Sequence, residues 1–257
     1  KIIIGGGGGT LISMGLKPNR RTMHPNMVQG VRECVEFLKS LSPNEPILFN
    51  KEIFQITGPK PEWIDQPSPK IYVGATKPKM LSMATEVADG LIMSDVTLAR
   101  IDECMDVINQ SIKANGRDRK TFAISNLFSW HVKLDKEEAI AEARSKLFVR
   151  GMLDYWYTST FLDSNESQIV EDNLHAFAEA YAHNSNDIKG VGDDIVEKLI
   201  NNLTFTGDFN DIDRFTEEMI QFKNAGLDEF AIRLYKKPEQ SMKVIAERVV
   251  PYLLGHK

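Results

Sequence analysis

Cysteine is scarce in this sequence of 257 residues, which contains only Cys34 and Cys104. A disulfide framework or a zinc site requires more cysteines, so we expect two buried thiols in a reducing cytosol. No apolar run approaches the roughly 20 residues of a membrane span, and the first residues do not form a signal peptide. Positive charge is in deficit, with a net charge of −5 and basic residues scattered singly. We therefore expect a cytoplasmic protein with neither nucleic-acid nor membrane partners.

Strand-like apolar runs alternate with helical periodicity along most of the chain. Strands that alternate with helices of ten or more residues form βαβ units and a parallel sheet, so the expected fold class is α/β. We predict strands at residues 2–4, 71–73, 90–93, 122–128 and 229–234.

No proline- or serine-rich linker divides the chain, so we expect a single domain over residues 1–257. The segment 135–205 is helical in pattern and is read as an insertion before the last strand. A small hairpin is expected within residues 47–56. The first strand is apolar at every position, which is typical of a strand covered on both faces, yet only Lys1 precedes it. We therefore expect that earlier residues were trimmed or are absent from this sequence.

A glycine run, Gly5–Gly9, follows the first strand immediately. Glycines there remove side chains, so a ligand or another backbone can approach closely. A dinucleotide-binding fingerprint would need G-x-G-x-x-G leading straight into a helix, whereas residues 10–15 and a basic loop follow here. Two interpretations stay open, a hinge at a strand end or a ligand-facing loop that includes Gly7, Gly9 and Thr10.

The segment Gly74–Lys79 joins the end of a predicted strand to the start of a predicted helix. Small residues, the capping hydroxyl of Thr76, backbone N–H groups and two lysines come together there. The helix dipole and the unpaired N–H groups of a first turn both favour an anion. The segment is therefore either a phosphate-binding loop or an ordinary helix cap with surface lysines.

Met93 and Ser94 lie at the carboxyl end of the next predicted strand, which is the active-site face in a parallel barrel. Arg233 is a charged residue among apolar residues of the last strand. It either points toward an anion at the barrel mouth or pairs with a structural carboxylate. The five histidines have no metal-ligand spacing, so no metal site is expected, and no Ser–His–Asp set or nucleophile elbow is recognised.

At these motifs the sequence resembles the luciferase-like family of flavin- and deazaflavin-dependent oxidoreductases. The most specific part begins at Ile71–Gly74 and runs on to the Asp89–Gly90 turn. Residues 73–80 are closest to the coenzyme F420 branch, which includes the methylene-tetrahydromethanopterin reductases. The other resembling stretches are residues 1–9, 32–41, 49–54, 116–118 and 225–229.

The resemblance implies a (β/α)₈ TIM barrel, of which this chain supplies about five of eight strands. Three βα units would be missing on the N-terminal side, and in the family they contain most candidates for a catalytic acid or base. The catalytic residues are therefore left unknown. The resemblance implies a cofactor site formed by Gly7, Gly9, Thr10, Gly74, Ala75, Thr76, Lys77, Met93 and Ser94, in which the backbone N–H groups of Ala75, Thr76 and Lys77 hold the phosphate.

The activity implied by the resemblance is hydride transfer between coenzyme F420 and a small organic substrate, in one-carbon metabolism. Arg233 is the residue expected to bind that substrate, and family members are commonly homodimers. Two alternatives stay open. One is an FMN-dependent monooxygenase that uses dioxygen at the same pocket, and the other is a shortened barrel that binds flavin or a partner without catalysis.

Overall fold

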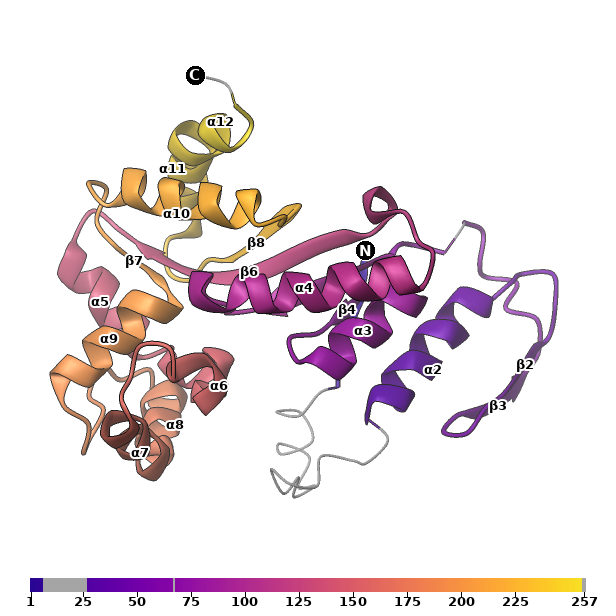
Figure 1. Ribbon diagram of the computed structural model, residues 1–257, viewed down its shortest axis with the longest axis horizontal. Coiled ribbons are helices and arrows are strands. Elements are labelled where there is room, and N and C mark those ends of the chain that lie inside the picture. The colour runs from indigo at the N-terminus through magenta and orange to yellow at the C-terminus, as the bar shows by residue number, and fades with distance from the viewer. Residues whose placement is uncertain (7–26, 67, 256–257) are drawn as a thin grey trace. The chain divides into compact units, whose positions relative to one another are not determined.

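The computed structural model describes residues 1–6, 27–66 and 68–255. They form two compact units, which we describe separately (Figure 1). The first unit contains the described residues up to Ile92 together with Asp106–Ile124, and the second contains Met93–Met105 and the chain from Ser125 onward. The division falls within three elements, β5 (Gly90–Ser94), α4 (Leu98–Ala114) and β6 (Ala123–Val132). The expectation of a single barrel domain over residues 1–257 stays a prediction.

A parallel sheet forms the centre of the first unit. In it β4 (Ile71–Gly74) pairs with β1 (Ile2–Ile4) on one side and with β5 on the other. The register places Ile71 opposite Ile2 and Gly74 opposite Ile92. The first three residues of β4 are buried, as the fully apolar pattern of a parallel strand predicts.

The first unit also contains a helix pair and a hairpin. Helices α2 (Met27–Ser40) and α3 (Pro78–Val87) pack against each other. The predicted hairpin is present as the antiparallel strands β2 (Ile47–Asn50) and β3 (Gln55–Gly58). The second strand begins later than the sequence pattern suggested, because the Lys51 N–H donates to Phe54 O at 3.0 Å and closes a turn there.

The first strand, β1, differs from the expectation of a strand covered on both faces. Ile2 is 38% exposed and Ile3 is 56% exposed. Among the described residues, β1 pairs only with β4 and therefore lies at the edge of the sheet. Ile2 and Ile3 are therefore left exposed by the part of the chain that the structure describes, whereas Ile4 is half-buried.

The Asp89–Gly90 turn connects α3 to β5 and is tied to both β4 and α2. One Asp89 carboxylate oxygen accepts from the Ile71 N–H and the other from Lys39 Nζ, each at 2.8 Å. A Cβ atom on Gly90 would lie 2.6 Å from Ala123 O and 2.8 Å from the Tyr72 ring. Only glycine fits this approach, since a backbone oxygen cannot move aside for a side chain.

The second unit is built on β6, which pairs in parallel with β7 (Phe205–Gly207) and β8 (Glu229–Arg233). Trp130 lies opposite Phe205, and Ser129 lies opposite Arg233. The sequence pattern did not predict β7, because three residues are too few to show an alternating period. The other strand predictions are confirmed within a few residues at their ends.

The segment predicted as a helical insertion, residues 135–205, consists of helices and their connections up to Leu203, and its being an insertion stays a prediction. Its helices share a buried apolar core and form one group in Figure 1. Asp135 caps the first of them and Asp163 forms a capping box with Glu166 in the third, which explains where both helices begin. The helices are α5 (Lys136–Arg144), α6 (Tyr155–Thr158), α7 (Ser164–Asp172), α8 (Leu174–His183) and α9 (Asp193–Leu203).

Three helices complete the second unit, α10 (Ile212–Asn224), α11 (Pro238–Val244) and α12 (Val250–Leu253), with a π-helical turn between the last two. None of the helices in the described ranges is long and apolar enough to cross a membrane. The α/β class and the parallel strand pairing are confirmed. The described strands do not close into a barrel.

Candidate functional site

The loop between β4 and α3 contains the predicted phosphate-binding residues. Ala75 is buried, and its N–H donates to Ile92 O at 3.0 Å. That bond continues the sheet, so the N–H group of Ala75 is already used by β5, and its role in holding a phosphate stays a prediction. Thr76 is half-buried and Lys77 is exposed, which places these two residues where a ligand could reach them.

The N-terminus of α3 has an arrangement that favours an anion. Its N-cap residue is Lys77 rather than Thr76 as predicted, and no side chain caps the helix. Pro78 occupies the first turn, which has no acidic residue, and Lys77 and Lys79 are both exposed. Two cations at the positive end of a helix dipole are unfavourable, and an anion bound there would relieve the repulsion.

The remaining predicted cofactor residues are only partly described. Gly7, Gly9 and Thr10 lie outside the described residues. Gly74 is half-buried at the end of β4, where a Cβ atom would lie 3.6 Å from Ile4 O. Met93 is buried and Ser94 is half-buried at the end of β5. Both belong to the second unit, so their joint action with the β4–α3 loop stays a prediction.

Arg233, the predicted substrate residue, lies at the end of β8 and is exposed. Its guanidinium carbon lies 5.3 Å from the centre of the Tyr235 ring. Within the described part of the chain it forms no ion pair with a carboxylate. The interpretation of Arg233 as part of a structural ion pair therefore has no support in these residues, whereas the anion-binding interpretation stays a prediction.

A buried ion pair follows β5 directly. Arg150 Nη1 donates to Asp95 Oδ1 at 2.7 Å, and both side chains are almost completely buried. The other Asp95 oxygen accepts from the Ser94 hydroxyl at 2.8 Å and from the Gly151 N–H at 3.0 Å. Asp95 has a φ of 57°, a conformation that aspartate tolerates better than most residues. Sequence reasoning missed this pair, because its two members are 55 residues apart.

The two faces of β6 have opposite chemistry. Its even-numbered positions include Phe128 and Trp130, whose rings pack against aromatic side chains of β7, β8 and α10. Its odd-numbered positions include Ser129 and His131, which are completely buried, and the next odd position beyond the strand is the buried Lys133. Successive side chains of a strand point to opposite faces, so these three residues share one face.

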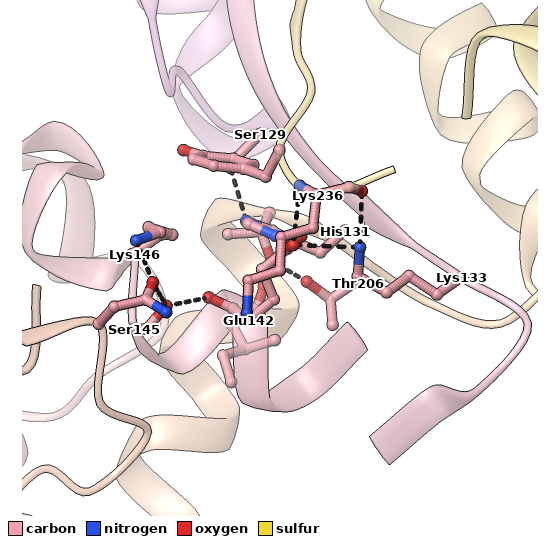
Figure 2. A network of polar contacts seen from close by, with 12 residues as sticks. Ser129, His131, Lys133, Glu142, Ser145, Lys146, Thr206 and Lys236 are labelled. Atoms are coloured by element: carbon pink, nitrogen blue, oxygen red, sulfur yellow. Dashed lines mark hydrogen bonds and ion pairs between the residues drawn. The ribbon is translucent and has the colours of Figure 1, made fainter. Parts of the chain in front are cut away.

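Glu142 of α5 joins this polar face into a network (Figure 2). His131 Nδ1 lies 2.8 Å from Glu142 Oε2, and His131 Nε2 lies 2.8 Å from Ser129 Oγ. The other oxygen, Glu142 Oε1, lies 3.1 Å from Lys133 Nζ and accepts from the Lys236 N–H at 3.1 Å. Lys133 also donates to Lys236 O at 3.1 Å.

The network holds the loop that follows β8. The Tyr235 ring stacks on His131 with the ring centres 4.6 Å apart, and the backbone of Lys236 is bonded to both Glu142 and Lys133. Lys237 has a φ of 55°, which turns the chain into α11. Buried, mutually satisfied polar groups of this kind specify one conformation, since any displaced loop would leave them unpaired.

Protonation states in the network follow from burial and from its hydrogen bonds. Burial lowers the pKa of His131 below its ordinary value, with Arg150 and Lys133 adding to the effect and Glu142 opposing it. Burial opposes ionisation of Glu142, but hydrogen bonds from His131 and Lys133 outweigh it and lower the pKa of that carboxyl. The ring is therefore neutral at pH 7, with its proton on Nδ1 facing the carboxylate.

His131 is bonded to Ser129 through Nε2 and to Glu142 through Nδ1, as the histidine of a serine hydrolase triad is bonded to its serine and carboxylate. Ser129 is, however, completely buried inside a strand and bonded to its neighbours. A nucleophilic serine sits on an exposed turn beside an oxyanion hole. The set therefore positions Tyr235 and its loop. The alternation of polar and apolar residues along β6 could have revealed the polar face, but not its partner Glu142.

The unfolding free energy should fall on acidification because of His131. Its folded pKa lies below the unfolded value of about 6.5, so its contribution is present above that pH and is lost as the pH drops. One proton taken up on unfolding gives a slope of up to about 1.4 kcal/mol per pH unit. Urea unfolding at several pH values from about 7.5 to about 5 measures this slope in the unaltered protein and in the His131→Gln variant. Equal slopes in the two proteins would contradict the assignment.

A family model described as luciferase-like monooxygenase matches residues 2–229. The chain belongs to this family, which confirms the resemblance drawn from the sequence motifs. It is 25% identical over 227 residues to the 5,10-methylenetetrahydromethanopterin reductase of Archaeoglobus fulgidus, covering 87% of this chain. The chain spans 66% of the length of that relative.

Solved structures show the same fold. The coenzyme F420 dependent tetrahydromethanopterin reductase of Methanopyrus kandleri matches with a TM-score of 0.69 and 17% identity, over 98% of this chain and 73% of that one. The oxygenating constituent of 3,6-diketocamphane monooxygenase from Pseudomonas putida, in complex with FMN, matches with a TM-score of 0.54 and 17% identity. That alignment covers 93% of this chain and 67% of the other. The fold is thus that of the luciferase-like barrels.

Proposed function

We propose that this chain forms the cofactor-phosphate end of an oxidoreductase that uses coenzyme F420 for hydride transfer to or from a small organic substrate. The observation that carries the proposal is the similarity to the Archaeoglobus fulgidus reductase over most of the chain. The Methanopyrus kandleri structure, whose name includes coenzyme F420, supports the same choice. From the resemblance we also propose a cytoplasmic homodimer acting in one-carbon metabolism.

The residues at the start of α3 fit a cofactor phosphate. The first turn has no acidic residue, and no side chain forms a capping hydrogen bond with it. Lys77 and Lys79 add positive charge there. The cofactor, when bound, supplies the hydride chemistry. This chain would hold its phosphate with Thr76, Lys77 and the first turn of α3, next to the end of β4. We assign no catalytic residue to this chain.

An FMN-dependent monooxygenase is the second candidate. It is favoured by the family model and by the similarity to the Pseudomonas putida monooxygenase component, which is in complex with FMN. Coenzyme F420 and FMN both have a phosphate next to a ribityl chain, so the loop before α3 suits either one. The absorption spectrum of cofactor released from the purified protein distinguishes deazaflavin from flavin. Titration with each cofactor then gives its affinity, and binding of neither would contradict both candidates.

Lys77→Glu should weaken cofactor binding by roughly tenfold or more. The change puts a carboxylate where the phosphate is proposed to bind and removes one positive charge from the helix N-terminus. Fluorescence titration with coenzyme F420 and with FMN measures the effect. Lys60→Glu is the matched control, because it makes the same charge change at an exposed residue of the β3–β4 connection. Equal affinities in the two variants would rule out the proposed phosphate site.

A further inference from the structure

Many basic side chains of the second unit form ion pairs. Arg100, Lys136, Arg144, Lys198, Arg214, Lys237 and Arg248 each form an ion pair with an aspartate or glutamate. Lys146, Arg233 and Lys236 form no ion pair with a carboxylate among the described residues, and the same holds for Lys189, Lys223 and Lys243 elsewhere in the unit. Lys146 follows α5, Arg233 is the last residue of β8 and Lys236 follows β8, and the buried network joins these two elements.

A cavity of about 290 Å³ lies beside two of these cations. Its walls include Lys236, Ser145 and Asn184. Lys146 Nζ donates to Asn184 Oδ1 at 2.6 Å, which brings its ammonium group to the cavity wall. The Ser145 hydroxyl lies 3.4 Å from the same amide oxygen. The cavity is therefore polar; Lys236 is a cation of its wall, and Lys146 reaches that wall through Asn184. Lys146, Ser145 and Lys236 are labelled in Figure 2.

The acidic residues in the cavity wall are already paired. Glu138 accepts from Lys237 Nζ at 3.1 Å, and Glu142 is bonded to His131 and Lys133. Neither carboxylate forms an ion pair with Lys146 or Lys236. The positive charge at the cavity is therefore not neutralised by its own walls.

Burial and nearby positive charges both disfavour the charged form of Lys146. Burial lowers the pKa of Lys146 below its ordinary value, and the charges of Lys236 and Arg233 lower it further against the opposing charge of Glu142. The positive charges of Lys236 and Arg233 thus both act on the protonation of Lys146. A bound anion would relieve this repulsion, because opposite charges at short range favour the charged form of an amine.

We propose that this cavity is an anion-binding subsite, in which Lys146 and Lys236 bind a carboxylate or phosphate group of a small ligand. The subsite lies wholly in the second unit, whereas the α3 N-terminus lies in the first. It binds its anion whichever cofactor the protein uses. The network of His131, Lys133 and Glu142 fixes the position of Lys236 through its backbone, so the subsite is preformed.

The test uses the full protein and isothermal titration calorimetry with two probes, inorganic phosphate and glutarate. Lys236→Gln and Lys146→Gln should each weaken binding of the preferred probe by about tenfold, the effect of losing one charge-assisted hydrogen bond. Binding should also weaken as KCl is raised from about 50 to 300 mM. Lys243→Gln is the matched control, because Lys243 is an exposed lysine of α11 that does not line the cavity.

Lys236→Gln leaves the network intact, since only the backbone of Lys236 contacts Glu142 and Lys133. Unchanged thermal unfolding of that variant therefore shows that weaker binding reflects the lost charge. Failure of both probes to bind, or equal affinities in all three variants, would overturn the proposal. If coenzyme F420 or FMN displaces the bound probe, the subsite binds a charged group of the cofactor. If probe and cofactor bind at the same time, the subsite binds the substrate. Lys77→Glu, by contrast, should leave probe binding unchanged.

Discussion

Arg150→Met is expected to lower the free energy of unfolding by about 3–5 kcal/mol, the cost of leaving one member of a buried ion pair without its partner. Arg150 Nη1 donates to Asp95 at 2.7 Å, and the arginine is only 1% exposed. Methionine fills much of the same volume, so the loss reports the uncompensated Asp95 carboxylate rather than a cavity. Urea denaturation at pH 7 measures it.

Two further variants test the physical reason for that loss. Arg214→Met removes an exposed arginine from its pair with Asp211 and should cost less than about 1 kcal/mol. In the double variant Asp95→Asn/Arg150→Met the buried charge is gone, while asparagine keeps the hydrogen bonds from Ser94 and Gly151 and tolerates the positive φ. The double variant should therefore be more stable than Arg150→Met alone. A double variant that is less stable would contradict the ion-pair explanation.

Glu142→Gln should lower the free energy of unfolding by about 2–4 kcal/mol. The two Glu142 oxygens face three donors, from His131, Lys133 and the Lys236 backbone. Glutamine has one oxygen and one amide NH₂ group. The NH₂ group is a donor and would therefore face another hydrogen-bond donor in place of an acceptor. Lys133, which is 7% exposed, would also lose its counter-charge. Urea denaturation gives the stability, and near-UV circular dichroism reports the packing of the Tyr235 ring against His131.

Glu138→Gln is the matched control for this change. Glu138 lies one turn earlier on α5, and its pair with Lys237 is partly exposed, so the same substitution should cost no more than about 0.5 kcal/mol. A similar small loss in both variants would show that the network contributes little to stability. A large loss at Glu142 with an unchanged Tyr235 signal would show that the network does not hold the loop after β8.

Several features of the site were predictable because they are local in the chain. The β4–α3 loop is a strand end followed within a few residues by Pro78 and a helical pattern, so both its position and its positive charge follow from adjacent residues. The helical insertion and the hairpin are likewise continuous segments with clear periods. The resemblance that placed the chain in its family rests on such segments too, and the family model confirms it.

Other features depend on contacts between segments that the sequence alone does not bring together. The hydrogen bond that uses the Ala75 N–H joins two neighbouring strands, and the shift of the N-cap from Thr76 to Lys77 depends on backbone geometry that residue types do not specify. The strand β7 has only three residues, and pairing with β6 rather than its own pattern makes it a strand.

The sequence by itself therefore determined the α/β class, most of the elements and the position of the loop before α3. Only the tertiary structure decided which buried polar groups meet. Asp95 finds Arg150 across 55 residues, Glu142 accepts from the Lys236 backbone across 94, and Ser129 lies beside Tyr235 across 106. Periodicity along a chain tells which face of an element is polar, whereas hydrogen-bond partners are selected by the packing of elements that are distant in sequence.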